Sequence, residues 1–270
     1  MCLILRAILP NIRARVPDTN KLGEDIVMTC QLCGKDKKLI KSHIIPKGFF
    51  KPMQSERQAA LLYSNTENVH PKRSPIGFYD KNILCKECDA KLGVWDEYAQ
   101  KLLLHSFNED HAVYNGKDKV YYTIKDFDYN LLKLFFISML WRASITGHEC
   151  FKRISTGPFE KILRNLILSD SSGEEDEFPV TLAKFSNPDF KFILDPHKDK
   201  FDHINYCRFY LTGFVAYIKV DKRKSVGMHE MFKIKKDKPI LIILRDLHGS
   251  KDGDVMKGIA AKNGKYFNNT

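Results

Sequence analysis

Residues 29–48 read TCQLCGKDKKLIKSHIIPKG, and residues 82–89 read NILCKECD. Each stretch contains one C-x-x-C pair beside polar residues, and the four cysteines are Cys30, Cys33, Cys85 and Cys88. A structural zinc ion takes four soft ligands in a tetrahedron, and two such turns from separate elements supply them. We therefore predict that the four thiolates bind one Zn²⁺, which contributes much of the folding free energy of this part of the chain.

The remaining cysteines favour a metal centre over a disulfide framework. The chain has 270 residues and seven cysteines, of which Cys2, Cys150 and Cys207 are scattered. Disulfide scaffolds belong to small secreted domains, whereas metal-bound thiolates suit a reducing compartment. No segment reaches the roughly 18 consecutive apolar residues of a membrane span. We expect a soluble, cytoplasmic protein without a membrane partner.

The charge balance favours a polyanionic partner. Lys and Arg number 44 against 33 Asp and Glu, which gives a formal net charge of +11. Basic side chains near phosphates release condensed counterions, and this release drives nucleic-acid binding. Basic proteins without such a role are also common, so the charge alone indicates a nucleic-acid partner without proving it.

The first part of the chain is predicted to be a small module around the metal. Residues 1–27 are expected to be a disordered, non-native upstream extension, because Met28 directly precedes the first cysteine motif. The module itself covers residues 28–106. Within it we expect a short β-hairpin around residues 39–45, a long loop over 49–78 and a helix over 88–105.

The second part is predicted to be a larger domain over residues 107–250. Asn115-Gly116 indicates a turn between two strands, and the run from Asp128 to Thr146 is apolar on nearly all sides, which is typical of a buried helix. Another helix begins at Pro158. Later apolar runs are strand-like, and residues 251–270 are expected to be a loose tail. The predicted fold class is α+β, with a buried helix and antiparallel strands behind the zinc module.

The order of the first motifs resembles that of the HNH endonuclease superfamily, whose ββα-metal fold often carries a four-cysteine zinc. The family pattern is C-x-x-C, then (D/H)HI-x-P, then N-x-x-x-LC-x-x-CH. This chain has CQLC at 30–33, SHIIP at 42–46 and NILCKEC at 82–88, followed by Asp89. The resemblance covers residues 28–100. It implies a ββα-metal or treble-clef-like module and an uncharacterised bacterial nuclease, in a phage-defence or mobile-element setting.

The resemblance also implies roles for three residues. His43 stands where the family has the general base that activates water. Asn82 stands near the position of the amide that orients the imidazole or its loop. Asp89 stands where a ligand of the catalytic cation belongs, and its carboxylate suits Mg²⁺ or Mn²⁺.

Three departures from the family pattern bear on catalysis. Ser42 replaces the acidic or histidine ligand before the base, Asn82 is closer to the second cysteine pair than in the family, and Asp89 replaces a histidine. A different carboxylate, from Asp80 or Glu97, could complete the cation site. Ser42 could instead hold a water in the shell of the cation.

These observations support three hypotheses. The first is a metal-dependent endonuclease that acts on DNA, with the C-terminal domain selecting the substrate or a protein partner. The second is a zinc-stabilised nucleic-acid-binding or interaction module that has lost cleavage, and the third is a structural knuckle on an unrelated domain. A basic strip could contact phosphates or be a solvated loop: Lys47, Lys51, His70, Lys72 and Arg73. On the apolar helix, Trp141 and Arg142 are expected in the core, with Arg142 in an ion pair.

Overall fold

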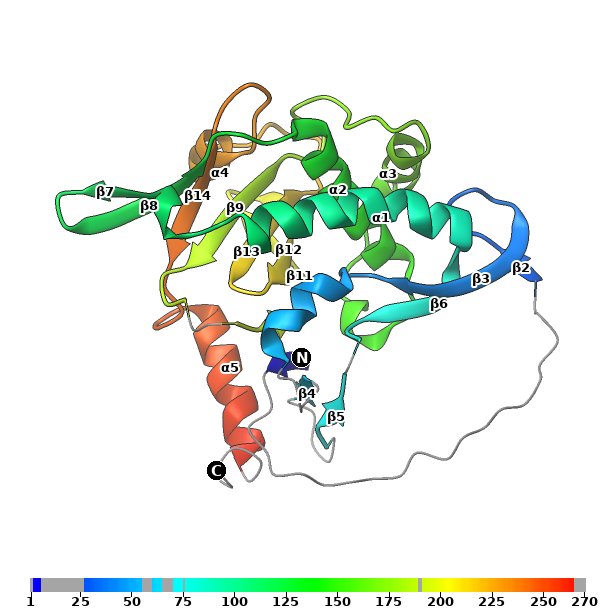
Figure 1. The fold of residues 1–270 in the computed structure, drawn as a ribbon, viewed down its shortest axis with the longest axis horizontal. Helices are drawn as coiled ribbons and strands as arrows, with labels where there is room; N and C mark the ends of the chain where they lie inside the picture. The colour runs from blue at the N-terminus through cyan, green and yellow to red at the C-terminus, as the bar shows by residue number, and fades with distance from the viewer. Residues whose placement is uncertain are drawn as a thin grey trace.

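The computed structural model describes residues 2–5, 27–54, 60–64, 70–74, 76–188 and 191–264. These residues form a mixed α+β structure, as predicted (Figure 1). Its five α-helices are α1 (Lys86–Gln100), α2 (Tyr129–Ile145), α3 (Phe159–Leu168), α4 (Gly227–Phe232) and α5 (Lys251–Lys262). Shorter helical turns are η1 (Lys47–Met53), η2 (Lys101–His105), η3 (Glu109–His111) and η4 (Glu149–Phe151).

The strands of the described residues form three sheets. The largest has the order β11 (His197–Phe201), β12 (Ile204–Leu211), β13 (Phe214–Lys219), β9 (Val180–Phe185), β14 (Ile240–Arg245), β8 (Asp118–Ile124), β7 (Ala112–Asn115). The second has the order β10 (Ile193–Leu194), β1 (Cys2–Leu5), β4 (Leu61–Ser64), β5 (Lys72–Arg73). The third, which positions the candidate site, is β2 (Val27–Thr29), β3 (Asp36–His43), β6 (Tyr79–Cys85).

Both faces of the largest sheet are covered, because its strands carry apolar residues at successive positions. On β12, Cys207 and Phe209 belong to the core that includes α2, while Tyr206 and Tyr210 belong to a second cluster with β4 and α5. Successive side chains of a strand point to opposite faces, so the two clusters lie on opposite sides of the sheet. All neighbouring strands pair antiparallel except β9 and β14.

Helix α2 is buried on nearly all sides, which confirms the prediction from its apolar sequence. Asp128 caps it, its side chain accepting a hydrogen bond of 2.9 Å from the Leu131 amide. Helices α1 and α3 both pack against α2, and Figure 1 shows α1 and α2 next to each other. Among the described residues, no helix is both long and apolar enough to cross a membrane.

The part of the chain with the four cysteines and the larger domain share one hydrophobic core. Buried residues of the first cysteine turn, of α1, of α2 and of β12 belong to a single cluster, for example Cys30, Leu92, Phe135 and Phe209. The predicted boundary between residues 106 and 107 therefore falls inside one continuous core.

Two expectations about the ends of the described chain are wrong. Residues 2–5 are not disordered but form β1, whose backbone pairs with β4 on one side and β10 on the other. Residues 6–26 lie outside the described residues. Residues 251–262 are not a loose tail but form α5, which Ser250 caps by accepting a 3.1 Å hydrogen bond from the Gly253 amide and which buries Ile259.

The expected hairpin and long loop also need correction. Strand β3 runs without a turn from Asp36 to His43 and pairs with β6, far along the chain, because its apolar residues pack under α1 and against β6. The expected loop over 49–78 contains the end of η1 together with β4 and β5. Their partners are distant in sequence, so no local periodicity indicates them.

Candidate functional site

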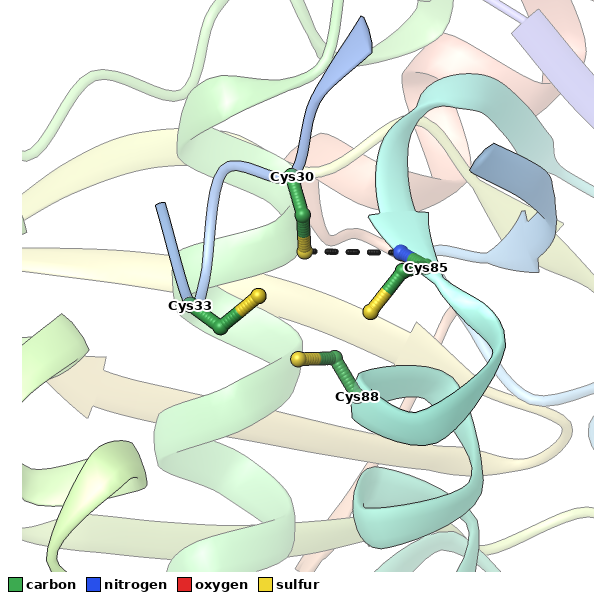
Figure 2. Close-up of side chains that lie close together, drawn as sticks. All are labelled: Cys30, Cys33, Cys85 and Cys88. Atoms are coloured by element: carbon green, nitrogen blue, oxygen red, sulfur yellow. Dashed lines mark hydrogen bonds between the residues drawn. The ribbon is translucent and has the colours of Figure 1, made fainter. Parts of the chain in front are cut away.

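The four predicted cysteines converge on one point. Their sulfur atoms all lie within 4.8 Å of one another, and Figure 2 shows the four side chains directed toward a common centre. Zn–S bonds of about 2.3 Å place the sulfurs of a tetrahedral site about 3.8 Å apart, so the cluster fits such an ion after a small contraction. The cluster can therefore hold a metal ion such as zinc, as predicted for these residues.

Two different elements supply the pairs, and local geometry shapes each one. Cys30 and Cys33 lie in the turn between β2 and β3, where the Gly34 amide donates to the Cys30 carbonyl at 2.8 Å. Gly34 has φ +71°, a left-handed conformation that glycine adopts without strain. Cys85 is the last residue of β6, and Cys88 lies in the first turn of α1.

Backbone amides favour a thiolate at one sulfur of the cluster. Burial alone would raise the pKa of Cys30, but amides including those of Cys33 and Cys85 donate to its sulfur and bring the pKa down to about 7. The Cys85 amide lies 3.4 Å from the Cys30 sulfur (Figure 2). Burial raises the pKa of the Cys88 thiol. Thiolate is the form that binds metal, so the turn is already arranged for a cation.

The strand pair β3–β6 connects the cysteine cluster to His43. At one end Leu39 is paired with Cys85, and at the other His43 is paired with Tyr79. The register shifts between Ile40 and Ser42, which indicates a β-bulge. Any ion that fixes Cys85 therefore also fixes the strand that carries His43.

His43 is half-buried, and its ring is held by a backbone carbonyl. Its Nε2 lies 3.0 Å from the Ile76 oxygen. A carbonyl only accepts, so Nε2 donates a proton in this contact and Nδ1 keeps its lone pair. Burial lowers the pKa of His43, against the opposing influence of the Ile76 carbonyl and of the negative charge of Asp89. The imidazole is therefore neutral at pH 7 and has the form that a base requires.

The turn that presents the Ile76 carbonyl depends on Gly77. This glycine has φ +77°, and an added Cβ would come within 2.4 Å of the Phe50 ring. A glycine is thus required both by the left-handed backbone and by the close approach of the ring.

Asp89 acts on His43 through its charge, whereas Asn82 has no hydrogen bond to it among the described residues. Asp89 lies half-buried in the first turn of α1, and its negative charge partly opposes the lowering of the His43 pKa by burial. Asn82 is exposed on β6, and its backbone amide donates to Asp80 Oδ1 at 2.9 Å. The Ile76 carbonyl, rather than the Asn82 amide, orients the imidazole.

The alternative carboxylates do not complete a cation site within the described residues. Asp80 Oδ2 accepts hydrogen bonds from the Thr146 hydroxyl at 2.6 Å and the Gly147 amide at 3.2 Å. Glu97 is exposed. In the part of the chain that the structure describes, the four cysteines are the only group of three or more Cys, His, Asp or Glu close enough to share an ion.

Sequence reasoning missed Asp96, which is the partner of Arg142. The predicted ion pair of Arg142 is confirmed, with Nη1 at 2.8 Å from Asp96 Oδ2 and Nη2 at 2.7 Å from Oδ1. Trp141 is buried as expected. The available signal was an acidic residue on the apolar face of α1, between Leu92 and Ala99. The Ile76 carbonyl had no signal, because a backbone atom leaves no mark in the sequence.

Basic and aromatic side chains occur on the strands next to His43 and on the surface of this part of the chain. Lys41 is exposed two residues before His43, and its ammonium lies 5.5 Å from the ring centre of Tyr79, the strand partner of His43. All five residues of the basic strip are also exposed: Lys47, Lys51, His70, Lys72 and Arg73. The last two form β5, so they are not part of an irregular loop.

Ser42 does not face a cation site. Its side chain is completely buried, and its hydroxyl has no hydrogen-bond partner among the described residues. The idea that this hydroxyl holds a water in the shell of a cation is therefore wrong for this structure, since a buried and inaccessible oxygen cannot contact solvent around an ion.

Ser42→Ala is expected to stabilise the fold slightly. An unpartnered buried hydroxyl costs about 1–3 kcal/mol of desolvation free energy, and alanine removes it while leaving a small void. Chemical denaturation should show a free energy of unfolding that is unchanged or raised by about 1 kcal/mol. A loss of more than about 1 kcal/mol would show that the hydroxyl does have a buried partner.

Comparison with known proteins gives no relative: no family model, no curated protein and no solved structure matches this chain. The function must therefore be argued from the residues and their geometry alone.

Proposed function

We propose that this chain is a cytoplasmic, metal-dependent endonuclease of the HNH kind that hydrolyses phosphodiester bonds in DNA, with His43 as the general base and Zn²⁺ in the cysteine cluster. The observation that best supports the proposal is that a backbone carbonyl holds the His43 ring. Its Nε2 is engaged by the Ile76 carbonyl at 3.0 Å, and its Nδ1 keeps a lone pair.

The residues of this chain account for the activation of the nucleophile. His43 Nδ1 would take a proton from the water that attacks phosphorus, while the bond from phosphorus to the leaving oxygen breaks. The nearby charge of Asp89 would stabilise the imidazolium that forms, as it already opposes the effect of burial on the pKa of His43. A bound Mg²⁺ or Mn²⁺ would neutralise charge on the phosphate. Asp89 is the residue that would hold it, although the described residues do not complete a three-ligand site.

The surface supports a nucleic-acid substrate. The net charge is +11, and the exposed Lys41 lies above Tyr79 beside the imidazole. Lysine supplies counterion release and the aromatic ring a stacking surface, and nucleic-acid-binding proteins combine these two features. The exposed strip with Lys47, Lys51, Lys72 and Arg73 extends the basic character beyond the site.

The direct test is cleavage of supercoiled plasmid DNA with Mg²⁺ or Mn²⁺. His43→Ala is expected to lower the cleavage rate by about 100-fold or more, because general-base catalysis contributes about 10²–10⁴-fold. His105→Ala is the matched control, since His105 is exposed at the end of η2 and has no assigned role. Equal nicking by the wild type and His43→Ala would refute the assignment of the base.

The pH dependence of the cleavage rate should reflect a base that is partly buried. Only neutral His43 can accept the proton, and burial holds its pKa below the ordinary value of 6.5. The rate should therefore stay level as the pH falls from 8 to about 6.5 and should decrease only below that, where the imidazole becomes charged. A decrease that begins above pH 7 would contradict the described environment of His43.

The second candidate, a zinc-stabilised nucleic-acid-binding module without cleavage, is favoured by one observation. The described residues offer no third ligand for a catalytic cation, and Ser42 is buried away from it. Under this proposal the wild type shifts DNA in a gel, with affinity that falls steeply with salt, but does not nick it with any divalent cation. The same preparation tests both candidates.

A further inference from the structure

One buried guanidinium joins three elements at the candidate site. Arg142 of α2 makes the two-pronged ion pair with Asp96 of α1, and its Nη1 also donates to the backbone carbonyl of His43 on β3 at 2.7 Å. The Arg142 side chain is 1% exposed. Its planar fork suits this arrangement, because a lysine could not bond both carboxylate oxygens and a carbonyl in the same plane.

The contact falls where the strand ladder ends. His43 is the last residue of β3, and beyond it the Ile44 amide donates to the Phe78 carbonyl at 3.0 Å. Arg142 donates to the His43 carbonyl, which belongs to the same peptide group as the Ile44 amide. The backbone of His43 is thus held by Arg142, and its ring is held by the Ile76 carbonyl.

Stability alone gives a weak reason for such a pair. Taking two charges out of water offsets most of their attraction, and apolar residues of similar volume are often as stable. Geometry offers a stronger reason, because a base displaced by about 1 Å can lose about 100-fold in rate.

We propose that Arg142 and Asp96 are positioning residues for His43: Asp96 aligns the guanidinium, which fixes the His43 peptide and so the direction of Nδ1. This inference rests on the proposed function. Under this inference α2, which belongs to the larger domain, supports the catalytic residue His43, although Arg142 itself touches no substrate.

The test replaces the ion pair by an apolar pair. The double variant Asp96→Leu/Arg142→Met keeps side-chain volume in the core but removes the bond to His43. Its kcat for plasmid cleavage should fall by about 10- to 100-fold while KM stays within about threefold. Trp141→Phe is the matched control, because it removes a partly buried 3.0 Å hydrogen bond to Glu160 from the same helix without touching His43. This control should keep the wild-type kcat.

A second measurement does not need cleavage. Amide hydrogen exchange over residues 42–45 should become faster in the double variant and stay unchanged in Trp141→Phe. If the wild type never cuts DNA, the proposed function fails, and the exchange rates still decide whether the pair holds the strand. Unchanged kcat together with unchanged exchange would overturn the inference.

Arg142→Lys guards against a folding defect in the double variant. It keeps the positive charge and the long aliphatic stem but loses the planar fork. The expected result is bound metal close to that of the wild type and a modestly lowered thermal stability, because a buried acceptor loses its donor, with a kcat lowered by at least about tenfold. A wild-type kcat in Arg142→Lys would also overturn the inference.

Discussion

Cys30→Ser is expected to release the metal ion and to unfold the turn, β3 and the start of α1 together. In zinc-finger peptides the apparent free energy of zinc binding is about 10–16 kcal/mol, and most of it is folding free energy. Here three sulfurs would remain, and β3 would lose the fixed end of its partner strand β6. Metal analysis should fall from one zinc per chain to near zero, and the melting temperature should fall sharply.

Cys207→Ala is the control for this experiment. Cys207 is also buried, but it lies on β12 away from the cluster, and burial raises the pKa of its thiol to about 12, which keeps it neutral. One zinc per chain should remain in this variant. The cysteine cluster would not be a metal site if the purified wild type contained no metal, or if Cys30→Ser bound as much zinc as the wild type.

Asp252→Ala is expected to lower the free energy of unfolding by about 3–5 kcal/mol, because the partly buried Arg245 loses its carboxylate partner and the buried Arg208 keeps one carboxylate, Asp199, in place of two. Asp252 lies in the first turn of α5 under the largest sheet. It accepts hydrogen bonds from Arg208 at 2.8 Å and from the Tyr210 hydroxyl at 2.7 Å, and it pairs with Arg245 at 2.6 Å. Thermal unfolding should shift down by about 10 °C.

Asp254→Ala provides the matched control two residues further on. Its side chain is 72% exposed, and its ion pair with Lys257 spans 3.9 Å. Exposed pairs of this kind contribute about 0–1 kcal/mol, so the free energy of unfolding should hardly change. Equal effects of the two substitutions would mean that α5 does not bury its first turn as described.

The parts of the fold that sequence predicted correctly have local signals. The apolar sequence of α2 has no polar face, and Asn115-Gly116 forms the turn of the β7–β8 hairpin. The spacing of the cysteines likewise predicted a cluster that the structure confirms. That the ion is zinc, and that the chain cuts DNA, stay predictions.

The parts that sequence missed depend on pairing between distant segments. Strand β1 has no partner within its own neighbourhood, and α5 looks like a polar, glycine-containing tail until the contacts of Asp252 and Ile259 are known. At the site, the pattern marked His43 as special. What holds it, the Ile76 carbonyl and the guanidinium of Arg142, comes from separate segments that only tertiary structure brings together.

The central place of β1 in its sheet has a consequence for biosynthesis. Its amide and carbonyl groups pair with β4 on one side but with residues 193–194 on the other. During translation one edge of the β1–β4 pair stays unpaired until residues 193–194 have left the ribosome. A growing chain with an open edge is prone to joining a neighbour, so we expect nascent chains on crowded polysomes to need a holding chaperone during that interval.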